Sequence, residues 1–153
     1  MKLDKFDRAI VQVLQLDGRI ANSELAERVN LSESACLRRV RALEQAGLIE
    51  GYTAILNQQK AGCPVNVFVN ITLDKQDETD LRRFEEAVRK IPEVMECYLM
   101  TGDYDYVVRV VVADTADFER VHSKFLTRLP SVARVHSSFA LRTVQKSREL
   151  PIR

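Results

Sequence analysis

Three arginines lie within four consecutive residues of the N-terminal half, in the segment 37–41. A guanidinium group can hold a phosphate oxygen or bind the edge of guanine through two parallel hydrogen bonds. The formal net charge of the chain is only +1, but a global count hides local patches. We therefore take Arg38, Arg39 and Arg41 as candidates for contacts with nucleic acid.

A helix-turn-helix over residues 22–46 would position these arginines. Asn22 is a candidate N-cap of a first short helix, and Ser32 is a candidate N-cap of a second one. Between them, Asn30 suits a sharp turn because asparagine tolerates the left-handed conformation. The second helix would enter the major groove, as reading helices of this motif do.

The outward face of the second helix carries the predicted contacts. Its inward stripe is Cys36, Val40 and Leu43. Serine hydroxyls and free amides at a helix start can hold phosphates, and a methyl group can contact thymine. The predicted DNA-binding residues are Ser32, Ser34, Ala35, Leu37, Arg38, Arg39 and Arg41. From these residues alone, a plain three-helix bundle with a solvated basic face is the alternative.

The remaining residues of the N-terminal half complete a small helical domain. Asp4 can cap a first helix, with Asp7 in its first turn. Gly18 and Gly47 stand where C-terminal glycines would end the first and last helices. The short apolar segment 48–56 is predicted to form a strand or wing.

The second half changes to strands that alternate with helices. The predicted strands are residues 65–73, 94–101, 104–112 and 132–141, and the predicted helices are residues 78–90 and a segment that begins at Asp114 or Thr115 and ends before Pro130. The order βαββαβ is that of a ferredoxin-like fold, a four-stranded antiparallel sheet with two helices on one face. The predicted fold class is α+β, with an N-terminal winged helix-turn-helix domain.

A polar segment that ends in glycine separates the two halves. We predict a helix-turn-helix domain over residues 1–56, a hinge over residues 57–64 and a ferredoxin-like domain over residues 65–153. Each domain is small, so additional burial is expected from dimerisation through the exposed face of the sheet.

The cysteine pattern and the hydropathy of the chain argue against a metal-binding, membrane-spanning or secreted protein. Cys36, Cys63 and Cys97 form no CxxC pair, and neither His122 nor His136 stands near a cysteine at ligand spacing, so no metal is expected. No segment approaches the ~20 apolar residues that cross a bilayer, and the N-terminus lacks the apolar stretch of a signal peptide. The predicted location is the cytoplasm, away from membranes.

An enzyme is the first rival function. Cys97 could pair with His122 or His136 as thiolate and base, but all three lie in segments of apolar periodicity, where structural roles are favoured. Asp103 and Asp105 have no evident acid–base partner. We therefore predict no catalytic residues and no cofactor.

Long segments of the chain resemble the leucine-responsive regulatory protein / AsnC family, also called feast/famine regulators. The resemblance rests on residues 3–7, 14–20, 31–49, 102–106 and 137–141. One departure is Glu33-Ser34-Ala35, where members often carry a proline. The resemblance implies a sequence-specific transcriptional regulator of double-stranded DNA. The second rival is a metabolite-binding module that has lost DNA binding, and the three arginines argue against such a loss.

The resemblance also implies an effector-binding and oligomerisation role for the second domain. It implies a homodimer that assembles into larger rings such as octamers, with an amino-acid effector bound between dimers near the loop 100–105. Glycine lets backbone amides approach a carboxylate closely, and Asp103 or Asp105 could pair with an ammonium group. The predicted effector-binding residues are Met100, Thr101, Gly102, Asp103, Tyr104, Asp105, Ser137 and Ser138. Without the resemblance, an ordinary β-turn is the favoured interpretation of the loop.

Overall fold

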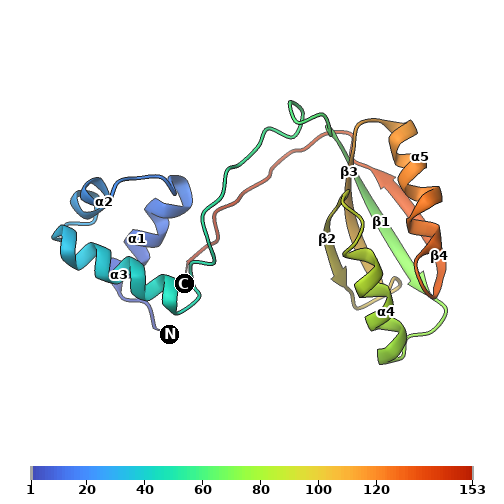
Figure 1. The fold of residues 1–153 in the computed structure, drawn as a ribbon, viewed down its shortest axis with the longest axis horizontal. Coiled ribbons are helices and arrows are strands. Elements are labelled where there is room, and N and C mark those ends of the chain that lie inside the picture. Colours follow the sequence, from blue (N-terminus) through green and yellow to red (C-terminus); the bar gives the residue numbers. More distant parts are fainter. Residues whose placement is uncertain (1, 153) are drawn as a thin grey trace. The chain divides into compact units, whose positions relative to one another are not determined.

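The computed structural model describes residues 2–152, which divide into two compact units (Figure 1). Unit 1 contains the residues up to Ile55 together with the C-terminal tail from Val144, and unit 2 is Leu56–Thr143. The tail thus groups with the helical half, whereas the sequence placed it in the second domain. The reason is a long-range contact, because Ile152 packs against the apolar core of unit 1.

Unit 1 consists of three helices, α1 (Lys5–Leu16), α2 (Asn22–Arg28) and α3 (Glu33–Gln45). Its core holds buried side chains from all three helices and from the C-cap of α2, which are Ile10, Val11, Leu25, Ala26, Val29, Cys36 and Leu43. The strand expected over residues 48–56 is absent from the part of the chain that the structure describes. These residues are instead extended and mostly exposed, and Tyr52 donates its hydroxyl to the Glu44 carboxylate at 2.9 Å.

The caps of α1 and α3 are as predicted. The Asp4 carboxylate accepts the backbone N–H groups of Phe6 and Asp7 at 2.8 and 2.9 Å, and Asp7 accepts the N–H of Asp4 at 3.2 Å. Ser32 caps α3, and its hydroxyl accepts the Ala35 N–H at 3.3 Å. The left-handed turn falls on Asn30, at φ 55°. These local signals fix where both helices begin.

Two local predictions were wrong. The N-cap of α2 is Ala21, and the Asn22 side chain instead donates to the backbone carbonyl of Glu33 at 2.9 Å. The first helix ends at Leu16, with Asp17 as its C-cap and without a left-handed Gly18, whereas Gly47 after α3 does adopt a positive φ of 73°. Asn22 therefore ties the two helices of the motif together rather than starting one of them.

Unit 2 is a four-stranded antiparallel sheet with two α-helices. Along the chain it contains β1 (Val65–Leu73), α4 (Glu78–Val88), β2 (Val94–Leu99), β3 (Tyr106–Val112), α5 (Thr115–Lys124), the short 3-10 helix η1 (Leu126–Arg128) and β4 (Val132–Phe139). The sheet order β2-β3-β1-β4 confirms the ferredoxin-like arrangement. The last helix is shorter than predicted because the chain leaves helical geometry at Phe125 and continues as η1.

The two faces of the sheet differ. Val67, Val69 and Ile71 of β1 are completely buried in one core with residues of both helices. The alternate residue Phe68 faces away from the helices and is 42% exposed. On the same outer face, Arg109 donates to Asn66 at 3.0 Å and to Glu96 at 3.1 Å. The outer face therefore combines exposed apolar side chains with the guanidinium of Arg109, whose hydrogen bonds are made to other side chains of the sheet.

No helix within residues 2–152 is both long and apolar enough to cross a bilayer.

Candidate nucleic-acid interface and ligand loop

The outward face of α3 carries a stripe of polar side chains. Ser34, Arg38 and Arg41 are all exposed, and their spacing places them on one side of the helix. Within residues 2–152, neither Arg38 nor Arg41 has an ion-pair partner. We call Ser34, Arg38 and Arg41 the reading face. Its guanidinium groups are free to take a phosphate or a base edge.

The flanks of the reading face carry smaller and apolar groups. Leu37 is 38% exposed, and Ala35 is half-buried. The Ser32 oxygen is occupied by the helix cap, but its hydroxyl hydrogen remains available for donation. Ser34 Oγ lies 3.4 Å from Ser32 Oγ, so the two hydroxyls form one polar group at the start of α3.

Arg39 is turned away from this face. Its Nη1 donates to Asp4 Oδ2 and to Asp7 Oδ1, each at 2.8 Å, and its guanidinium lies 5.3 Å from the centroid of the Phe6 ring. We call this group the Arg39 clamp. It ties α3 to the capping box of α1, because the same carboxylates also cap that helix.

The electrostatics of the clamp follow from these contacts. Hydrogen bonds to Asp7 and Asp4 raise the pKa of Arg39. The pKa of Asp4 is lowered, chiefly because its carboxylate accepts the Asp7 backbone N–H, with a further contribution from Arg39. The sequence grouped Arg39 with its neighbours, but Arg39 is three residues after buried Cys36 and four before buried Leu43. That spacing was the available signal that it borders the inward stripe.

The loop between β2 and β3 spans residues 100–105, outside both strands. The Met100 N–H donates to the Asp105 carbonyl at 2.8 Å and closes the loop, while Gly102 adopts a φ of 116°. Within the described residues, the backbone N–H groups of residues 101–104 donate to no acceptor. Consecutive free amides around a positive-φ residue are the usual means by which a backbone holds an anion.

The two aspartates of the loop have different roles. Asp105 Oδ2 accepts the Leu73 N–H at 2.7 Å, and the Asp105 N–H donates to the Ile71 carbonyl at 3.0 Å. Asp105 therefore fastens the loop to β1. Asp103 is exposed and, within residues 2–152, takes part in no ion pair. Of the two carboxylates, that of Asp103 is free for a ligand.

The serines of β4 lie on opposite faces of the sheet. Ser138 pairs with Phe68 on β1 and shares the outer face, whereas Ser137 pairs with Val69 and points toward the helices. His136 shares the outer face with Ser138, and its ring centroid lies 6.4 Å from that of Tyr104. The residue that approaches the loop from β4 is thus His136, which the sequence interpretation left out of the site.

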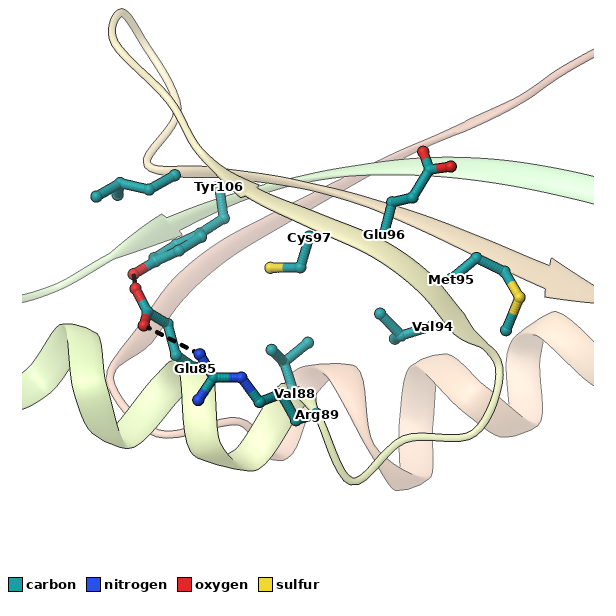
Figure 2. Close-up of a pocket in the computed structure, with 9 residues that line it drawn as sticks. Glu85, Val88, Arg89, Val94, Met95, Glu96, Cys97 and Tyr106 are labelled. Atoms are coloured by element: carbon teal, nitrogen blue, oxygen red, sulfur yellow. Dashed lines mark hydrogen bonds and ion pairs between the residues drawn. The ribbon is translucent and has the colours of Figure 1, made fainter. Parts of the chain in front are cut away.

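A cleft of about 460 Å³ opens between α4 and β2 (Figure 2). The Cys97 thiol points into this cleft, and its pKa is raised to about 11 by burial, with a further contribution from the Glu85 carboxylate. Glu85 accepts the Tyr106 hydroxyl at 2.8 Å and lies 3.7 Å from the Arg89 guanidinium. Glu85 and Arg89 are thus paired with each other, Glu96 pairs with Arg109 outside the cleft, and the thiol stays protonated near neutral pH.

The histidines considered as partners of Cys97 lie in other contacts. His122 packs on Phe118 at a ring-centroid distance of 5.9 Å, and His136 stacks on Tyr104. In the part of the chain that the structure describes, no three potential metal ligands are grouped together. The cleft therefore lacks the nucleophile and activated base that covalent catalysis needs.

Comparison with known proteins decides the family. Residues 3–50 match a family model described as winged helix-turn-helix DNA-binding, and residues 66–150 match the Lrp/AsnC ligand binding domain. The chain belongs to the Lrp/AsnC family of transcriptional regulators. It therefore combines a DNA-binding helix-turn-helix with a ligand-binding domain, in a family of regulators rather than enzymes.

Individual relatives cover nearly the whole chain. The leucine-responsive regulatory protein of Escherichia coli is 41% identical over 151 residues, which is 99% of this chain and 92% of that protein. An uncharacterized helix-turn-helix transcriptional regulator of Sinorhizobium fredii is 52% identical over 120 residues, which is 78% of this chain and 94% of its own. The first of these relatives confirms the resemblance to Lrp/AsnC regulators that the sequence motifs indicated, and the second is likewise a helix-turn-helix regulator.

A solved structure extends the likeness to three dimensions. The complex of a Neisseria meningitidis transcriptional regulator with L-Met has a TM-score of 0.93 at 36% identity and covers 98% of this chain and 97% of its own. The combination of helix-turn-helix and βαββαβ domain is thus the fold of this Lrp/AsnC chain.

Proposed function

We propose that this protein binds specific sites in double-stranded DNA through the reading face of α3 and that an amino acid bound at the loop 100–105 changes its DNA affinity or its assembly. The observation that best supports DNA binding is on the outward face of α3. There, the guanidinium groups of Arg38 and Arg41 are exposed and have no ion-pair partner among the described residues. Arg28, an exposed arginine on α2, is paired with Glu24, whereas Arg19 and Arg148, which are exposed and unpaired within residues 2–152, lie outside the helices of the motif.

Each residue of the predicted interface has a proposed role. Arg38 and Arg41 take phosphates or guanine edges, and Ser34 donates its hydroxyl to a phosphate. Leu37 and Ala35 supply apolar contact for thymine methyl groups. Ser32 positions the helix start and can donate to the backbone of the DNA. Arg39 acts indirectly, because its guanidinium is held by the two carboxylates of α1.

The effector site is proposed from the chemistry of the loop. The free amides of residues 101–104 suit the carboxylate of an amino acid, and the exposed Asp103 suits its ammonium group. The Neisseria relative in complex with L-Met supports an amino acid as the ligand. Met100, Tyr104 and Ser138 stand near the loop or on the outer face, whereas Asp105 holds the loop in place.

Assembly is proposed from the uncovered face of the sheet. Phe68 and Tyr98 lie on this face and are 42% and 55% exposed. A homodimer formed through this face would bury them and bring two reading helices together, and dimers could then join into larger rings such as octamers. An effector bound between dimers would alter how many reading helices engage DNA together. We assign DNA binding to residues 1–56 together with the tail from Val144, a hinge to residues 57–64, and effector binding with oligomerisation to the domain that follows as far as Thr143.

Genome-wide mapping of the bound DNA, with and without a panel of amino acids, tests the proposal. We expect roughly palindromic sites whose half-sites lie about one helical turn, or a multiple of it, apart. Occupancy should change with at least one amino acid. The variant Arg38→Ala with Arg41→Ala should lose these sites, while Arg83→Ala, an exposed arginine on α4, should keep them. Equal occupancy in both variants would exclude the reading face.

A further inference from the structure

The last residues of the chain are held by the first helix. The Gln15 side chain donates through Nε2 to the Leu150 carbonyl at 3.2 Å and accepts the Leu150 N–H through Oε1 at 2.6 Å. The two residues are 135 positions apart. A glutamine amide that satisfies both backbone groups of one residue acts as a short piece of β-ladder, so the pairing fixes the tail in one register.

An apolar contact accompanies this pairing. Ile152 is half-buried and packs against the core formed by α1, α2 and α3. Leu150, two residues earlier, uses only its backbone, and its side chain is 72% exposed. The docked segment therefore presents the Ile152 side chain to the core, while Leu150 is held through its backbone and leaves its side chain in solvent.

We propose that the tail segment 149–152 is an integral part of the DNA-binding unit, docked in a site formed by Gln15 of α1 and the adjoining apolar core. The occupant of this site is the chain's own C-terminus. Because α1 carries the carboxylates of the Arg39 clamp, docking also supports the helix that positions α3.

The connectivity of the chain gives this docking a wider consequence. The polypeptide passes between the units twice, once after Ile55 and again after Thr143. The second crossing leaves β4, the strand that carries the ligand-domain residues His136 and Ser138. A docked tail thus gives the ligand-binding unit a second connection to the DNA-binding unit, covalent where the tail leaves β4 and noncovalent where it docks on α1. This consequence for DNA binding rests on the proposed function, whereas the docking itself does not.

Hydrogen–deuterium exchange of the full-length protein, followed by mass spectrometry, tests the docking. Two matched pairs of variants separate docked from exposed groups. In the first pair, Ile152→Asp changes the side chain that packs on the core, and its control Leu150→Asp changes an exposed one. In the second pair, Gln15→Ala removes the amide that pairs with the tail, and its control Gln12→Ala removes an exposed glutamine of the same helix. Peptides from β1 in unit 2 report on global unfolding.

We expect Ile152→Asp and Gln15→Ala to speed exchange in α1 about tenfold, as loss of a half-buried apolar contact or a paired amide predicts. Leu150→Asp and Gln12→Ala should leave exchange in α1 unchanged, and β1 should be unaffected in all four variants. Equal exchange within each matched pair would overturn the proposal, and so would a parallel rise in α1 and β1. DNA affinity is measured separately, so a failure to bind DNA would refute the proposed function without touching the docking.

Discussion

A valine at position 102 tests the ligand loop, because the backbone there adopts a conformation that valine avoids. Gly102 has a φ of 116°, and no atom lies within 4 Å of the place where a side chain would begin. The first side-chain atom of the substitution therefore has open space around it, and the expected effect comes from the backbone conformation. β-Branched residues rarely adopt positive φ, so the loop must either hold a strained valine or change its shape.

The magnitude of each outcome can be estimated. If the loop keeps its shape, strain of roughly 1–3 kcal/mol lowers the Tm of unit 2 by about 4–8 °C per kcal/mol. If the loop changes its shape, the free amides of residues 101–104 take up new positions. Loss of one hydrogen bond to a charged carboxylate, at about 1.5–3 kcal/mol, would weaken amino-acid binding by roughly 10- to 150-fold. We expect the second outcome, because the loop is exposed and open around Gly102.

Isothermal titration calorimetry with L-Met, and then with the other amino acids, measures this effect. The control is Gly51→Val, since Gly51 also has open space around it but does not adopt a positive φ. Gly102→Val should lose amino-acid binding and keep DNA binding in the absence of ligand, while Gly51→Val should retain both. Unchanged amino-acid affinity in Gly102→Val would refute the placement of the effector at this loop.

Three further perturbations address other parts of the molecule. Arg39→Gln should lower DNA affinity without changing its salt dependence, because this guanidinium positions α3 through Asp4 and Asp7; fluorescence anisotropy at several salt concentrations measures both quantities. Asp4 has a lowered pKa, so its stabilisation is present above its unfolded value near 4 and is lost as pH falls through the folded value. The Tm of Asp4→Asn should accordingly lie below that of the unmodified protein at pH 6 and converge with it toward pH 2. Iodoacetamide should alkylate Cys97 at pH 8 far more slowly in the folded protein than in urea, because its pKa is about 11, and equal rates seen by peptide mass spectrometry would contradict the burial of this thiol.

Local and periodic signals made much of the fold predictable. The alternation of β1 predicted its observed bounds, Val65–Leu73, because four of its five inward side chains are buried and its outward ones are exposed or half-buried. The caps at Asp4 and Ser32 and the left-handed Asn30 were also predicted, since each depends on one residue and its immediate neighbours. In each case the physical cause lies within a few residues of its effect.

The features that escaped prediction depend on distant or competing partners. Asn22 could have capped α2, but the Glu33 carbonyl takes its amide instead. Arg39 was grouped with its basic neighbours, and only the position of Asp4 and Asp7 across the bundle shows that its charge is engaged. Nothing near Ile152 in sequence indicates that it enters the core of unit 1. Such pairings follow from the assembled fold and have no local pattern.

The salt dependence of DNA affinity tests the central claim, that Arg38 and Arg41 of the reading face contact DNA. The measurement is the slope of log affinity against log salt for the unmodified protein, the double variant Arg38→Ala with Arg41→Ala, and the control Arg83→Ala. Each lost phosphate contact lowers the slope by about 0.9, so one arginine that contacts phosphate in each of two reading helices of a dimer accounts for about 1.8. We predict a shallower salt dependence and a large loss of affinity in the double variant alone. An unchanged slope and affinity in that variant would contradict the assignment of α3 as the helix that reads DNA.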